Sequence, residues 1–234
     1  MRRTTALWHD RAEAGRALAQ RLIAWREHPT ALVLGLPRGG VVVAAEVARA
    51  LELPLASWAV RKLAHPRAPE LALGVIAPGG VLIWDEAMAG VQGLDATLRQ
   101  RIVAEQEREL ERRRLLYGDP DPAVLRDRPL LVVDDGVATG LTVRAALQSL
   151  RQTGPSRLVL AVPVIDRGIA ARLRQELDQL VALAEVDDLW AVGAWYERFA
   201  PVEDAKVLAL INACSADRAN SGATAHRRGR SDRP

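Results

Sequence analysis

Two adjacent aspartates at the end of an apolar run are the residues of this sequence best suited to chemistry. Asp134 and Asp135 follow "LLVV" and precede "GVATGLT". Neighbouring carboxylates are costly at the end of a buried strand, because burial disfavours the charged form and like charges repel. We therefore expect the pair to serve a ligand, and carboxylates accept hydrogen bonds well from vicinal sugar hydroxyls. Capping of an ordinary strand–helix turn is the simpler alternative.

The stretch after the aspartates has the composition of a phosphate-binding loop. Small side chains allow several backbone N–H groups to converge on one anion, and a helix that begins near Gly140 adds partial positive charge. The two threonine hydroxyls can donate to phosphate oxygens, whereas the lysine of a P-loop is missing from this stretch. The residues of this predicted loop are Gly136, Val137, Ala138, Thr139, Gly140, Leu141 and Thr142. With the aspartates they predict a sugar-phosphate site.

The segment "GLPRGG" places a cation and two glycines after the apolar run 31–36. Arg38 offers a forked set of donors for phosphate oxygens. Gly39 and Gly40 let the backbone approach a ligand closely. These three residues are candidate phosphate ligands, and an ordinary Pro-Gly turn is the alternative.

A second cationic site follows the apolar run 54–60. Arg61 and Lys62 come where this predicted strand ends, and two neighbouring cations suit a leaving group with several negative charges, such as pyrophosphate. The stretch 63–70 contains two prolines and is predicted to be a loop. Within it, Glu70 is one of the few side chains with reactive groups.

Predicted strands and helices alternate along the chain. This pattern, with continuous apolar strands, indicates a Rossmann-like α/β fold: a parallel sheet with helices on both faces and a ligand site beyond the carboxyl ends of its strands. The predicted strands are 31–36, 54–60, 129–133 and 157–164, with shorter candidates at 71–77 and 81–84 joined by a hairpin turn; the predicted helices are 10–27, 41–52, 95–117, 140–153 and 166–178.

The stretch "LLVVDDGVATGLT" resembles the phosphoribosyl-pyrophosphate (PRPP) motif of the type I phosphoribosyltransferases: an apolar strand, two acids, small residues, then Thr-Gly-x-Thr. "LGLPRGGVVVAAEVA", "RKLAHPRAPELALG" and "VGAWYERF" are similar, in the same order, to segments of a bacterial group of that family. The resemblance covers about residues 7 to 213.

The resemblance implies a role for each part of the site. The 5′-phosphate would lie on 136–142 and the ribose hydroxyls on the two aspartates. The pyrophosphate would lie on Arg38, Gly39, Gly40, Arg61 and Lys62. In the family the pyrophosphate loop often contains a cis peptide, an Arg-Lys pair leads into a loop that closes over the site, and a variable hood binds the acceptor. The hood candidates are 71–93 and 186–200.

The implied activity is transfer of ribose 5-phosphate from PRPP to a nitrogen acceptor, such as a nucleobase, with release of pyrophosphate. Mg²⁺ is the implied cofactor, held by Asp134 and Asp135 directly or through PRPP hydroxyls and water. The expected catalytic residues are Asp134, Asp135, Arg61, Lys62 and Glu70. A non-catalytic sensor of PRPP or a nucleotide is the alternative, since some family members are regulators.

Four of the nine aromatic residues fall within ten positions: Trp190, Trp195, Tyr196 and Phe199. A stacking platform for a planar base would explain this cluster. Packing of a C-terminal strand and turn against the core would explain it equally well, and we favour packing.

The net charge of the chain comes from its end. Residues 215–234 contain five arginines and two aspartates, which equals the net charge of +3, so the first 214 residues are balanced. We therefore expect one domain over 1–214, with no specific nucleic-acid surface, and a disordered basic tail over 215–234.

The sequence also favours a cytoplasmic protein. No apolar run approaches the about 20 residues that span a membrane, the N-terminus lacks the apolar core of a secretory signal, and a single cysteine fits a reducing compartment. The expected partners are PRPP and a small-molecule acceptor, with no membrane; a homodimer is compatible with the sequence.

Overall fold

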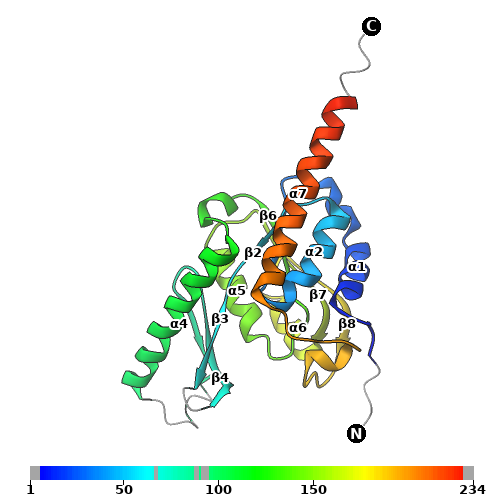
Figure 1. The fold of residues 1–234 in the computed structure, drawn as a ribbon. Helices are drawn as coiled ribbons and strands as arrows, with labels where there is room; N and C mark the ends of the chain where they lie inside the picture. The colour runs from blue at the N-terminus through cyan, green and yellow to red at the C-terminus, as the bar shows by residue number, and fades with distance from the viewer. Residues whose placement is uncertain (1–5, 66–67, 87–89, 91–94, 229–234) are drawn as a thin grey trace.

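A five-stranded parallel sheet forms the centre of the protein (Figure 1). The computed structural model describes residues 6–65, 68–86, 90 and 95–228, with only the backbone of 69, 70 and 218–228. The strand order is β2–β1–β6–β7–β8. The strands are β1 (Leu32–Gly35), β2 (Leu55–Ser57), β6 (Pro129–Val133), β7 (Arg157–Asp166) and β8 (Gln179–Val186). This sheet confirms the predicted fold class.

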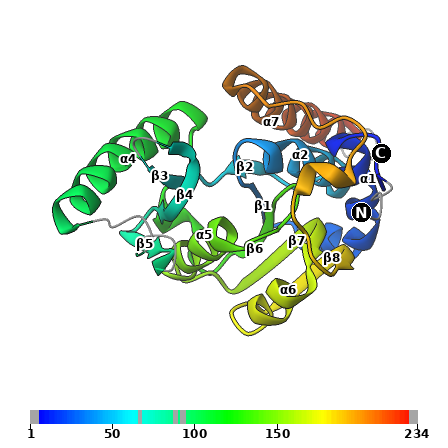
Figure 2. The ribbon, with the colours of Figure 1, turned by 90° about the horizontal axis from the view of Figure 1, so that it is seen from below.

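Helices cover both faces of this sheet (Figure 2). On one face lie α1 (Arg11–Arg21) and α2 (Gly39–Leu51), with α7 (Asp204–Arg228) against α2; on the other lie α5 (Leu141–Arg151) and α6 (Arg167–Leu173). The strands divide their side chains by alternation, as a pleated strand must. In β6, Leu131 and Val133 pack in the core with α1 and α2, whereas Leu130 and Val132 pack in the core with α5 and α6.

A three-stranded antiparallel sheet stands beside the main sheet (Figure 1). It consists of β3 (Arg61–His65), β4 (Ala68–Ala77) and β5 (Val81–Trp84). One face packs against α4 (Ala96–Tyr117) and the other against α5. The hairpin turn predicted between β4 and β5 is confirmed, with Gly79 and Gly80 at φ of 78° and 75°.

The loop predicted for 63–70 is wrong, because β3 and β4 pair across it, with His65 opposite Ala68. Residues 66–67 lie outside the described part of the chain. The strand predicted for 54–60 is also shorter, so the Arg61-Lys62 pair begins β3 instead of ending β2.

Buried hydrogen bonds join the two sheets. The Trp58 indole N–H donates to Ser149 Oγ (3.2 Å), and the Ser149 hydroxyl donates to the carbonyl of Pro78 (2.6 Å). Ser149 belongs to α5, the helix that begins directly after the loop 136–140. The same helix therefore follows the predicted phosphate loop of the main sheet and bonds to the hairpin of the smaller sheet.

The C-terminal segment differs from its prediction. The part of the predicted tail at 215–228 continues α7 as a helix, and 229–234 lie outside the described residues. Figure 1 shows the end of α7 projecting from the body. Short 3₁₀ turns occur at η1 (Ile23–Glu27), where the helix predicted for 10–27 tightens, and at η2 (Pro122–Leu125) and η3 (Val192–Trp195).

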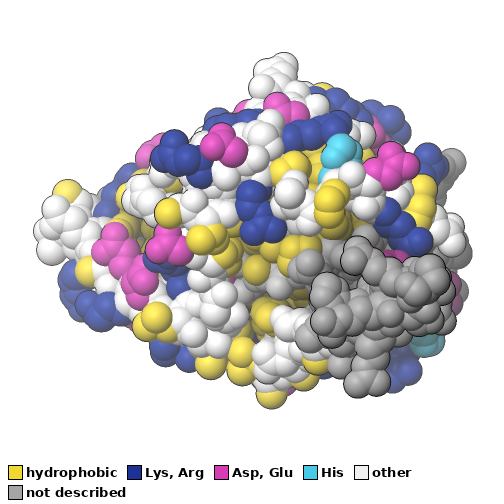
Figure 3. All heavy atoms as spheres, turned by 90° about the horizontal axis from the view of Figure 1, so that it is seen from above, with side chains coloured by type: hydrophobic (Ala, Val, Ile, Leu, Met, Phe, Trp, Pro, Cys, Tyr) yellow, Lys and Arg dark blue, Asp and Glu magenta, His cyan; other side chains and the backbone are white. Residues whose placement is uncertain are grey.

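The surface carries mixed charge. On the face shown in Figure 3, basic and acidic side chains are interspersed and do not gather into a patch of one sign. Over the part of the chain that the structure describes, no helix is long and apolar enough to cross a membrane.

Candidate functional site

The candidate site lies where two neighbouring strands end. β1 and β6 are paired, with Gly35 beside Val133, so the segments that follow them meet at one edge of the sheet. A cleft of about 380 Å³ opens at this edge. It is lined by Arg11, Pro37, Arg38, Gly39, Lys62, Asp134, Asp135, Gly136, Val137, Ala138, Thr139, Gly140, Thr142, Val143, Val192 and Phe199. The acids, the phosphate loop and two of the predicted cations are thus brought together.

The two aspartates are held in an environment that disfavours their charge. Burial, together with the neighbouring Asp135 carboxylate, raises the pKa of Asp134 well above its ordinary value. Burial also raises the pKa of Asp135, while the Arg11 guanidinium opposes that rise. The side chain of Asp134 accepts the backbone N–H of Asp135 (2.9 Å), which fixes the turn between them. A ligand hydroxyl or cation that reached this pair would offset the cost of burial.

The phosphate loop presents free backbone donors to the cleft. Among the described residues, no acceptor is found for the N–H groups of Ala138, Thr139 and Gly140, and the first turn of α5 adds more. Val137 differs, because its N–H donates to the carbonyl of Val164 (2.9 Å) and is not available to a ligand. Gly140 has φ of 75°, and a β-carbon there would stand 2.6 Å from the Ile169 side chain. Only glycine fits this turn.

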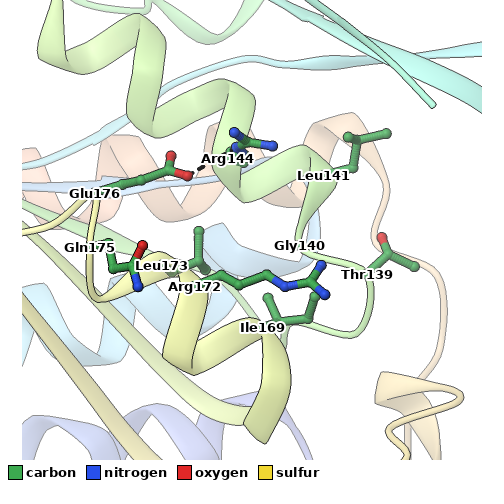
Figure 4. A pocket seen from close by; sticks show the side chains of 9 residues that line it. All are labelled: Thr139, Gly140, Leu141, Arg144, Ile169, Arg172, Leu173, Gln175 and Glu176. Carbon is green, nitrogen blue, oxygen red and sulfur yellow. Dashed lines mark ion pairs between the residues drawn. The ribbon is translucent and has the colours of Figure 1, made fainter. Parts of the chain in front are cut away.

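Leu141 lines a second hollow behind the loop and not the cleft itself (Figure 4). This hollow of about 380 Å³ shares Thr139 and Gly140 with the cleft. Arg144 of α5 pairs with Glu176 (3.0 Å), and in Figure 4 the Arg172 side chain extends toward Gly140. This ion pair connects the first turn of α5 to the segment that follows α6.

The Arg38 loop meets the acids as predicted. The Pro37–Arg38 peptide is cis, as the family resemblance implied. A β-carbon on Gly39 would overlap the Asp135 carboxylate, so a side chain at this position would displace the acid. Gly40 does not line the cleft but packs against Asp134. The Arg38 guanidinium also lies 3.6 Å from Asp204 at the start of α7.

The Arg61-Lys62 pair is divided between two faces of β3. Lys62 lines the cleft. Arg61 points to α4, where it donates to Gln106 Oε1 at 2.7 Å and 3.2 Å, and burial with nearby Arg113 lowers its pKa. The structure therefore does not bring Arg61 into the site. Glu70 lies in β4, and its side chain is outside the described part of the chain.

Most residues of the aromatic cluster pack against the protein core. Tyr196 is buried, its ring lies 5.6 Å from that of Trp8, and its hydroxyl donates to the carbonyl of Asp135 (2.6 Å). Phe199 packs beside Tyr196 and also lines the cleft. Trp190 differs, because it is 93% exposed. Packing is thus correct for Tyr196 and wrong for Trp190.

Sequence reasoning missed several cleft residues, above all Arg11. Its Nε donates to Asp135 Oδ2 (2.7 Å) although the two residues are 124 positions apart. A lone arginine after a helix cap carries no local signal of such a contact. Pro37 and Val143 border the predicted loops without having been singled out, and Val192 falls within the hood candidate 186–200.

Comparison with known proteins defines the class to which this fold and site belong. The family model described as "Phosphoribosyl transferase domain" matches residues 7–195, and the chain belongs to that family. A Mycobacterium tuberculosis protein, provisionally named a phosphoribosyl transferase, is 42% identical over 219 residues, which are 93% of this chain and 49% of that protein. The chain thus spans about half the length of the curated relatives it matches first.

Two further proteins are similar to this chain, one of them a solved structure. The crystal structure of TT1426 from Thermus thermophilus is 41% identical, has a TM-score of 0.67, and is matched over 87% of this chain and 97% of that chain. The bifunctional protein PyrR of Bacillus pumilus is 49% identical over 55 residues, 23% of this chain and 30% of that protein.

Proposed function

We propose that the chain binds PRPP with Mg²⁺ and transfers ribose 5-phosphate to a nitrogen acceptor, releasing pyrophosphate. One observation carries the proposal: a single cleft joins an acidic pair, a loop of free N–H donors and the cations Arg38 and Lys62, from three separate parts of the chain. These groups match the hydroxyls, the 5′-phosphate and the pyrophosphate of PRPP, respectively. Membership of the family supports the same conclusion.

Each group has a physical role in the proposed reaction. The N–H groups of 138–140 and the hydroxyls of Thr139 and Thr142 bind the 5′-phosphate at the start of α5. Arg38 and Lys62 stabilise the charge that develops on the departing pyrophosphate. Among the described cleft residues the carboxylates of Asp134 and Asp135 are assigned to the ribose hydroxyls, so catalysis by these groups is mainly positioning and charge stabilisation.

The donor set of the cleft fits Mg²⁺. No cluster of three or more potential ligating side chains is found among the described residues. Mg²⁺ is commonly held by one or two carboxylates together with substrate oxygens and water, and Asp134 and Asp135 supply such carboxylates. When bound, the ion would neutralise charge on the pyrophosphate.

The acceptor would meet an apolar wall. Val192 and Phe199 line the cleft from the C-terminal segment, so 186–200 contributes more of the described lining than 71–93 does. A flat, largely apolar acceptor such as a nucleobase fits this wall best.

Pyrophosphate release tests this function. The protein is incubated with PRPP, Mg²⁺ and each of a panel of purines and pyrimidines. At least one acceptor should release pyrophosphate, and Lys62→Met should slow release about a hundredfold, the usual cost of one charge-stabilising group. Lys206→Met is the matched control, because Lys206 is the other lysine of the chain and lies exposed on α7.

The outcomes separate the two candidate functions. Tight PRPP binding without release for any acceptor would replace transfer with sensing. An unchanged rate in Lys62→Met would contradict the role given to that cation.

A further inference from the structure

Arg11 occupies an unusual place in the site, because it belongs to the first helix and yet contacts the loop that follows β6. It is the first residue of α1, directly after the capping residue Asp10. Its Nε lies 2.7 Å from Asp135 Oδ2, and the side chains of Arg11 and Asp135 are only 11% and 15% exposed. A largely buried pair with a short hydrogen bond is held firmly, because breaking it leaves an uncompensated charge.

The other side of Arg11 holds the C-terminal segment. Its Nη1 donates to the carbonyl of Ala200 (2.9 Å), and its guanidinium lies 3.6 Å from the centre of the Phe199 ring. The same segment reaches Asp135 a second time, because the Tyr196 hydroxyl donates to the Asp135 carbonyl. Asp135 is thus held at its backbone by Tyr196 and at its carboxylate by Arg11.

The Arg38 loop also packs directly against the pair of Arg11 and Asp135. A β-carbon on Gly39 would overlap the Asp135 carboxylate and would stand 3.0 Å from the Arg11 Nε. Gly39 and Arg11 therefore both pack against the same carboxylate oxygen, Oδ2. Asp134 has a different environment, since among the described residues its carboxylate accepts a hydrogen bond only from the Asp135 N–H.

We propose that Arg11 is a positioning residue for Asp135: it holds one carboxylate oxygen so that the other faces the ribose hydroxyls of PRPP. The two aspartates then differ: Asp135 is positioned in advance by Arg11, whereas Asp134 accepts a hydrogen bond only from the backbone N–H of Asp135 among the described residues. This inference rests on the proposed function, and it adds a residue from outside the PRPP motif to the ribose site.

A double-mutant cycle tests the inference. The variants are Arg11→Met, Asp135→Asn and the double variant, and the readouts are the Kd for PRPP with Mg²⁺ and the Tm. Each single change should weaken binding about tenfold, as expected for members of one hydrogen-bond network. The Kd of the double variant should be at most about twice the higher of the two single-variant Kd values, because Arg11 acts only through Asp135.

Two further variants separate positioning from stability. Arg11→Lys keeps the charge but loses the second arm, so it should recover part of the affinity; it also replaces Arg11→Met if that variant does not fold. Arg16→Met is the control, since Arg16 lies on the same helix, is 60% exposed and is 3.9 Å from its nearest carboxylate partner, Glu46. Its Kd should be unchanged.

Each result decides the matter. If Arg11→Met lowers the Tm and leaves the Kd unchanged, Arg11 is only a structural contact and the inference is overturned. Additive losses in the double variant would overturn it too. If the unaltered protein does not bind PRPP with Mg²⁺, the proposed function and this inference both fall, whereas normal binding with an insensitive Arg11 removes this inference alone.

Discussion

The two sheets of the molecule differ in the burial of their strands and in the site residues that they contribute. The parallel sheet is covered on both faces, and Leu130, Leu131, Val132 and Val133 of β6 are fully buried. In the antiparallel sheet, Leu82 of β5 is 42% exposed. The parallel sheet carries the acids and the phosphate loop at its edge, whereas the antiparallel sheet adds Lys62 to the described lining. The acids and the loop after them therefore follow a strand that is buried on both faces.

The largest effect should come from a cavity in the parallel sheet. Leu131→Ala removes a fully buried side chain at the centre of β6 and should lower the free energy of unfolding by about 2–5 kcal/mol. Leu82→Ala in the antiparallel sheet should cost less than about 1 kcal/mol, because its side chain is largely solvated. Urea denaturation measures both. Equal losses would remove the distinction between the sheets.

A smaller loss of stability should follow when the hydrogen bonds that join the two sheets are removed. Ser149→Ala removes the hydroxyl between the Trp58 indole and the Pro78 carbonyl and should cost about 1–3 kcal/mol, since two buried groups lose a partner. Hydrogen exchange should quicken in β4 and β5 and stay unchanged in β6. The exposed Ser215, which bonds within its own helix, provides the matched Ser→Ala control. Faster exchange throughout the molecule would show that α5 does not act as a local anchor.

The smallest predicted effect concerns pH and the helix that covers the antiparallel sheet. Hydrogen bonds from Arg112, and then from Arg113, lower the pKa of Glu109 in α4 from 4.5 to about 2. Glu109 therefore stabilises the fold above about pH 4.5, and this contribution is lost as the pH falls toward 2.

Glu109→Gln measures that contribution. Its cost should be below about 1 kcal/mol at pH 7, because these ion pairs are partly solvated and screened, and should shrink as the pH falls from about 4.5 toward about 2. Denaturation by urea at several pH values checks the slope. A cost that is constant with pH would contradict the assigned ion pairs.

The same two sheets show what the sequence could predict. Continuous apolar strands such as β6, whose bounds match the predicted 129–133, carry their own signal because both faces are buried. The pairing of β3 with β4 carries none. It runs through the proline-containing stretch 63–70 with two register shifts, and α4 and α5 pack against the resulting sheet.

The site follows the same rule. Asp134 and the loop after it lie in one contiguous motif, so their spacing reveals them. The sides of Arg61 and Lys62 depend on whether a strand ends or begins there, which composition does not decide. Arg11 reaches Asp135 only after the chain has folded.

Calorimetric titration with PRPP, with and without Mg²⁺, tests the central claim most directly. The unaltered protein should bind PRPP, and Mg²⁺ should strengthen that binding. Asp134→Asn should weaken it while keeping or raising the Tm, because the substitution removes a buried charge whose pKa is already raised. An absence of PRPP binding in either condition, or equal affinity in Asp134→Asn, would contradict the assignment of this cleft.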